Sequence, residues 1–107
     1  MKKIAITADT PLSALIRDNH HQELSLYLEQ WRRYLKGVNS DTDLFRLSYF
    51  EFDLDRLNVG VIYHSLALLI NHDAVMTNVS VLAGYVVEHS NMGIKKESVY
   101  RQINRYL

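Results

Sequence analysis

Apolar residues between positions 12 and 35 recur at steps of three and four, which places them on one face of a helix. Residues 17–23, RDNHHQE, contain no apolar side chain, so we expect two helices here with a break near Asn19. Thr10 and Pro11 predict the start of the first helix, because Thr can accept from unpaired amides and Pro fits the first helical turn. Residues 3–7 predict a short edge strand upstream of it.

The pattern changes between residues 38 and 54. Residues 38–43, VNSDTD, predict a loop. Residues 46–54 then alternate between apolar and polar side chains, as in a strand with one buried face. The apolar positions also fit helical steps, so a helix beginning at Asp43 is the alternative, and the sequence leaves both open. The alternating residues are Phe50, Phe52 and Leu54 on one side and Glu51 and Asp53 on the other.

The second half of the chain predicts three helices. Residues 57–70, LNVGVIYHSLALLI, are apolar nearly all round, as in a buried central helix. A further helix is expected over 81–89, capped by Thr77, Asn78 or Ser80. The last, over 95–107, is amphipathic, with Val99 and Ile103 on its apolar face.

These elements together predict a mainly α protein of four to five helices in one compact domain over residues 1–107, with at most a small strand element at 46–54. The pattern of the last two helices is typical of a helix-turn-helix. Apolar residues make up 48% of the 107, enough to build a core, and there is a single Pro.

Charge and composition narrow the function classes. Lys plus Arg and Asp plus Glu both number 12, so any nucleic-acid face must be local rather than a property of the whole chain. There is no Cys, which excludes thiolate metal sites and disulfides. No apolar run approaches the length of a membrane span. We therefore expect a soluble cytoplasmic protein with no membrane partner.

Candidate catalytic and metal-binding residues are few. Glu51, Asp53 and Asp55 would share one side of a strand, but no second element offers further oxygen ligands of the kind Mg²⁺ requires. The five His have no chelating spacing, and His64 is expected to be a hydrogen-bonded core residue. No P-loop, nucleophile elbow or dinucleotide fingerprint is present. We expect no enzyme activity, no metal and no cofactor, with a metal-dependent hydrolase centred on Glu51 and Asp53 as a third class of function.

The strongest functional signal lies in the last third of the chain. Leu82-Ala83 fits the first helix of a helix-turn-helix, and Val99 and Ile103 fit the inner face of the second. From residue 94 onward there are four basic side chains and one acidic. Arg and Gln read base edges, whereas Lys contacts phosphates. The predicted DNA-binding residues are Lys95, Lys96, Arg101, Gln102 and Arg105.

A second hypothesis is a helical protein–protein interaction module, with a protein partner or a homodimer. It would use the face formed by Tyr27, Trp31 and Tyr34, since aromatic residues often anchor interfaces. The competing interpretation is that Trp31 and Leu35 face the core.

The C-terminal half contains short motifs at Ile62-Tyr63, Ile70-Asn71, Val81-Leu82-Ala83-Gly84-Tyr85 and Tyr100-Arg101. At these positions it resembles the RteC family, regulators of the excision of conjugative transposons, and YFEFDLDR at 49–56 is similar to another segment of that family. The resemblance implies a helical domain with a winged-helix-like DNA-binding part.

Overall fold

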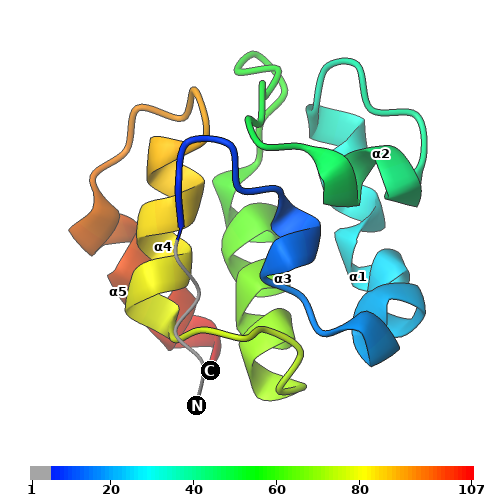
Figure 1. Ribbon diagram of the computed structural model, residues 1–107. Helices are drawn as coiled ribbons and strands as arrows, with labels where there is room; N and C mark the ends of the chain where they lie inside the picture. Colours follow the sequence, from blue (N-terminus) through cyan, green and yellow to red (C-terminus); the bar gives the residue numbers. More distant parts are fainter. Residues whose placement is uncertain (1–5) are drawn as a thin grey trace.

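Helices build all of the regular structure in residues 6–107, the part of the chain that this computed structural model describes. Helix α3 lies in the centre, with α1 and α2 on one side of it and α4 and α5 on the other (Figure 1). The prediction of a mainly α fold with four to five helices is therefore confirmed. The elements are η1 (Leu12–Ala14), η2 (Asp18–His20), α1 (His21–Tyr34), α2 (Asp41–Arg46), α3 (Val59–Asn71), α4 (Val79–Glu88) and α5 (Lys96–Tyr106).

Two Asn side chains start the helices that follow the acidic segment. Asn58 Oδ1 accepts from Gly60 N at 3.1 Å at the start of α3, and Asn78 Oδ1 accepts from Val81 N at 2.9 Å at the start of α4. Each bond satisfies an amide that has no partner within its own helix. The predicted central helix is confirmed, and Asn78 is the one of the three candidate caps (Thr77, Asn78, Ser80) that begins α4.

The helix predicted from Thr10 is replaced by two short 3₁₀ turns, although the break near Asn19 is confirmed. Thr10 Oγ1 accepts from Thr7 N at 2.8 Å and caps no helix. Backbone groups around Leu15 instead pair with another segment: Arg17 N donates to Ala74 O and Met76 N donates to Leu15 O. These long-range bonds compete with a continuous helix. Of the predicted strand at 3–7, residues 3–5 lie outside the described residues, and 6–7 form no strand.

The predictions for residues 38–54 need two corrections. The last part of the predicted loop is helix α2, which Ser40 caps by accepting from Asp43 N at 3.2 Å. The helix alternative from Asp43 holds only as far as Arg46, and no regular strand follows. Residues 48–49 form a bend, Phe50 and Phe52 make isolated bridges, and a turn begins at Leu54, so residues 50–53 are called the extended segment here. Phe50 and Phe52 are buried as the alternation predicts, but Leu54 is exposed.

The extended segment is hydrogen-bonded on both sides. Toward the end of α1, Lys36 N donates to Glu51 O at 2.8 Å and Asp53 N donates to Tyr34 O at 2.7 Å. Toward the α4–α5 connection, Phe50 N donates to the carbonyl oxygen of His89 at 2.7 Å. These bonds satisfy buried backbone groups that would otherwise cost free energy.

Asn91 completes the second side. Its Oδ1 accepts from Phe52 N at 2.8 Å and its Nδ2 donates to Phe52 O at 3.1 Å. The primary amide thus satisfies both backbone groups of one buried residue, as a strand partner would.

Aromatic rings fill the space between α1, α4 and the extended segment. Trp31 meets Phe50 edge-on with centroids 5.6 Å apart, and meets Phe52 at 5.9 Å. Phe50 also lies 6.0 Å from Tyr85 of α4. Such edge-to-face contacts favour a defined core over a loosely packed one.

Two buried side chains at the C-terminal end of α4, Tyr85 and His89, contact the backbone of residues 7–10. Tyr85 OH donates to Thr10 O at 2.7 Å. The His89 ring stacks on Tyr85, and its Nε2 and Nδ1 lie 2.7 Å from Thr7 O and 2.9 Å from Tyr85 O. A neutral imidazole can donate to one of these two oxygens, whereas the imidazolium can donate to both.

Alkaline pH is expected to destabilise the protein through its buried tyrosines. Burial raises the pKa of Tyr85 and of Tyr63 above the ordinary value of about 10. Their contribution is fully present below pH 10 and is lost as pH rises through the folded pKa, because the unfolded chain ionises first. Urea midpoints should fall between pH 9 and 11. Tyr85→Phe, which has one fewer buried phenol, should show a shallower decline, and an equal decline would contradict this assignment.

Candidate functional site

Helix α5 packs against α3 and α4 and leaves its opposite side to solvent (Figure 1). Val99 and Ile103 are fully buried on its inner side, as predicted. Leu82 and Ala83 of α4 are also fully buried. The arrangement holds α5 as a rigid helix whose remaining face is available for contact.

The predicted DNA-binding residues lie on or near that solvent side. Lys95 precedes the first turn of α5, and it is exposed together with Lys96, Arg101 and Arg105. Gln102 is half-buried, and its Oε1 lies 3.4 Å from Arg105 Nη1, which donates to it. Within residues 6–107, none of the four cations forms an ion pair with a carboxylate. Their charge is therefore not neutralised by the described part of the protein.

This unpaired charge is concentrated. Four of the 12 basic side chains but only one of the 12 acidic ones lie from residue 94 onward, so the remainder of the chain carries three more acidic than basic groups. The last segment is thus a cationic edge on an otherwise acidic protein, and a polyanion would approach this edge preferentially.

A depression of about 510 Å³ separates the start of α4 from the outer side of α5. Two of its lining residues, Lys96 and Arg101, are among the predicted DNA-binding residues, whereas Ser80, Tyr100 and Glu97 are new. The sequence offered one signal for this grouping. Residues 96, 97, 100 and 101 recur at helical steps, which places them on one face.

Gly84 brings Lys96 against α4. A Cβ at Gly84 would lie 3.2 Å from Lys96 Cε and 3.5 Å from its Nζ. The aliphatic part of the lysine therefore lies over the bare backbone of α4 while its ammonium group remains in solvent, as is common for long cationic side chains.

The helix-turn-helix expectation is met in part. Helices α4 and α5 pack against each other, but residues 89–95 connect them, which is longer than the usual turn of 3–4 residues. No strand pair that could serve as a wing occurs among residues 6–107.

The prediction that Tyr27, Trp31 and Tyr34 form an interaction face is wrong for Trp31, which is buried. Trp31 has 0% of its surface exposed and packs against Phe50 and Phe52, and Leu35 is also buried. The competing interpretation, with Trp31 and Leu35 facing the core, is confirmed. Tyr27 is exposed, and Tyr34 is partly exposed.

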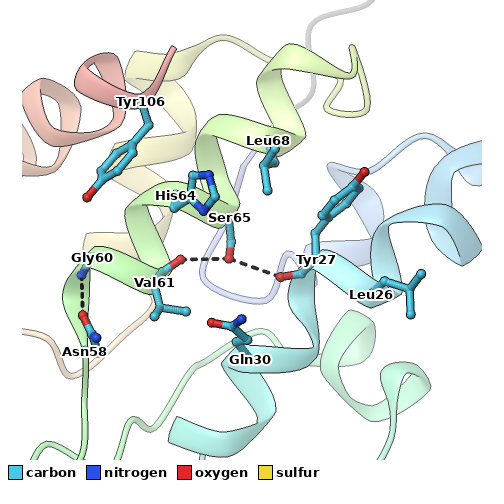
Figure 2. Close-up of a pocket in the computed structure, with 10 residues that line it drawn as sticks. All are labelled: Leu26, Tyr27, Gln30, Asn58, Gly60, Val61, His64, Ser65, Leu68 and Tyr106. Atoms are coloured by element: carbon cyan, nitrogen blue, oxygen red, sulfur yellow. Dashed lines mark hydrogen bonds between the residues drawn. The ribbon is translucent and has the colours of Figure 1, made fainter.

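A second concave surface lies between α1, α3 and the end of α5, with a volume of about 650 Å³ (Figure 2). Tyr27 forms one wall, and His64 with Tyr106 forms the other, their rings 5.4 Å apart. Ser65 Oγ lies within the groove, 2.8 Å from Val61 O and 3.2 Å from Tyr27 O, and its single proton is shared between these two acceptors. Leu26, at the rim, is 74% exposed.

His64 is therefore exposed, which corrects its expected place in the core. The sequence of α3 does not predict the exposure of His64, because a helix that is apolar nearly all round gives no indication of which side faces solvent.

Glu51 and Asp53 lie close to basic side chains. No group of three His, Asp or Glu residues with metal-binding geometry occurs in residues 6–107. Glu51 lies 3.6 Å from Lys36, and Asp53 lies 3.9 Å from Arg56, so both carboxylates face cations. Nothing in this arrangement supports a hydrolytic centre on Glu51 and Asp53.

Comparisons with protein-family models, curated proteins and solved structures give no match for this chain. None of the helices in residues 6–107 has the length and apolarity needed to cross a bilayer.

Proposed function

We propose that this protein is a small non-enzymatic DNA-binding regulator or accessory protein of mobile-element type. It contacts DNA through Lys95, Lys96, Arg101, Gln102 and Arg105 at α5. The mobile-element part of the proposal rests on the resemblance to the RteC family. The DNA-binding part rests on one observation, the exposed cations of α5 that no described carboxylate neutralises.

The physical argument is electrostatic. Each cation that meets a DNA phosphate releases condensed counterions, and this release provides most of the free energy of non-specific binding. Cations already paired with carboxylates would contribute less, because the pair must first be broken. The buried inner side of α5 keeps these side chains on a fixed helix rather than on a mobile tail.

Binding to a labelled DNA duplex is expected to depend steeply on salt. If all four cations meet phosphates, affinity should fall on the order of 10²-fold between 50 and 200 mM salt. The triple variant Lys96→Gln/Arg101→Gln/Arg105→Gln should bind more weakly and lower the salt slope by about three. Fluorescence anisotropy over a salt series measures both.

A matched variant controls for net charge. Arg33→Gln/Arg46→Gln/Arg56→Gln removes three exposed cations from α1, α2 and the loop after the extended segment. It should retain the wild-type slope. Absence of duplex binding at low salt, or an equal loss in both triple variants, would contradict the proposal.

The second candidate is the helical interaction module, with a second copy of the chain or another protein as partner and with the groove of Figure 2 in place of the face that contains Trp31. Leu26 favours it, because a large apolar side chain that is 74% exposed beside a partly apolar groove is suited to burial by a partner. Sedimentation velocity separates the candidates: a dimer that binds no duplex supports the module, and a monomer that binds duplex supports the regulator.

A further inference from the structure

The depression between α4 and α5 has the chemistry of a phosphate site. We infer that Ser80, Lys96, Tyr100 and Arg101 together hold one phosphodiester group of the DNA backbone, and that Glu97 weakens this contact. The inference rests on the proposed function and deepens it, because it assigns a particular contact to two helices instead of one charged face.

Two cations of α5 and one hydroxyl group from each helix line the depression. Lys96 and Arg101 of α5 bring positive charge, and neither is paired with a carboxylate in the described residues. Ser80 of α4 and Tyr100 of α5 add hydroxyl donors. No hydrogen bond within residues 6–107 occupies either hydroxyl. Phosphate oxygens accept from this set of groups, and Arg can bind two of them at once.

Gly84 places one of the cations. Because a side chain at this position would contact Lys96 Cε and Cδ at 3.2 and 3.4 Å, the bare backbone lets the lysine stem lie across α4 toward the depression. Gly84 is thus a positioning residue for the ammonium group. Gly84→Ala should displace Lys96 by a few tenths of an ångström without moving the α4 backbone, since a flexible side chain can yield.

We call the set of Ser80, Lys96, Tyr100 and Arg101 the clamp. Glu97 lines the same depression and places a negative charge beside it. Its carboxylate is exposed, yet no described cation pairs with it. A phosphate entering the depression meets this negative charge as well as the two positive ones. Removing the carboxylate should therefore increase affinity, an outcome that a damaged fold would not produce.

The experiment compares four single variants of the full chain by anisotropy with a labelled duplex over a salt series. Glu97→Gln should bind about two- to fivefold more tightly, as expected for an exposed charge interaction. Arg101→Gln should lower the salt slope by about one. Ser80→Ala and Tyr100→Phe should each weaken binding about tenfold or more, as expected for a hydrogen bond to a charged group.

Glu29→Gln on α1 is the matched control for Glu97→Gln, because it makes the same change in net charge at an exposed site away from α5. It should leave affinity within the error of the wild type. Equal gains in the two variants would mean that net charge alone acts, and would overturn the clamp.

The results separate the clamp from the proposed function. If duplex binding is lost in the α5 triple variant but unchanged in Ser80→Ala, Tyr100→Phe and Glu97→Gln, the clamp is wrong and the regulator proposal stands. If the wild type binds no duplex, the regulator proposal fails, and a titration with inorganic phosphate followed by NMR decides the clamp. Amide shifts confined to residues 80 and 96–101 would support a phosphate site, and unchanged spectra would overturn it.

Discussion

Replacement of Trp31 with alanine is expected to destabilise the protein by about 3–5 kcal/mol. Domains of this size have a free energy of unfolding of about 5–15 kcal/mol, so the variant should be partly or largely unfolded at 37 °C. The reason is geometric. Trp31 is fully buried and is the ring that both Phe50 and Phe52 meet, so its loss leaves a cavity against the extended segment.

Urea denaturation followed by far-UV circular dichroism measures the effect. Fluorescence cannot serve, because Trp31 is the only tryptophan of the chain. Trp31→Phe is the matched variant. It keeps an aromatic ring and removes Nε1, a buried donor without a hydrogen-bond partner in the described residues. It should therefore cost less than half as much as alanine. A Trp31→Ala variant as stable as the wild type would contradict the packing described for this core.

Replacement of Asn91 with alanine should cost about 2–4 kcal/mol, the second largest effect we expect. The change leaves the buried N–H and C=O of Phe52 without partners, and each unsatisfied buried group costs about 1–3 kcal/mol. Asn39, which is exposed, supplies the control: Asn39→Ala should change the unfolding free energy by less than about 0.5 kcal/mol.

Asn91→Asp tests the donor half of this contact alone. A carboxylate can still accept from Phe52 N, but its second oxygen would face Phe52 O, and two acceptors repel. The variant should be destabilised at pH 7. It should recover as pH falls toward 4, where a protonated carboxyl can donate again and its pKa is raised by the same repulsion. Equal destabilisation of Asn91→Asp at both pH values, relative to the wild type, would contradict the donor role.

Much of the helical fold could be predicted because local chemistry decides it. Asn78 at the start of an apolar run and the all-round apolarity of 57–70 identify α4 and α3 without knowledge of their neighbours. Helix α2 was missed although Ser40, three residues before Asp43, is a capping signal, because the polar residues around it are equally typical of a loop.

The extended segment could be predicted only in part, because its partners are far away in the sequence. Alternation correctly indicated that Phe50 and Phe52 are buried. No local pattern reveals that the bonds run to Tyr34 on one side and to the amide of Asn91 on the other, so neither a strand nor a helix was the right description.

For the candidate site, sequence indicated the basic face but not its surroundings. Helical spacing places Arg101 and Arg105 together, and periodicity places Val99 beneath them. Ser80 lines the depression, and Lys96 packs against Gly84, only because of the way α4 and α5 pack together. The residue types alone do not determine this packing.

The contacts of the extended segment also bear on how the protein folds. Phe52 and Asn91 are 39 positions apart, and the bond from Tyr85 to Thr10 spans 75. Loops of that length must close before these bonds form, so the rate-limiting step of folding should bring distant parts of the chain together. We therefore expect the protein to fold more slowly than a bundle of helices that contact only their sequence neighbours. Helices α4 and α5 separated from the first 58 residues would lose these partners, so the exposed cationic side of α5 would form only within the cooperatively folded protein.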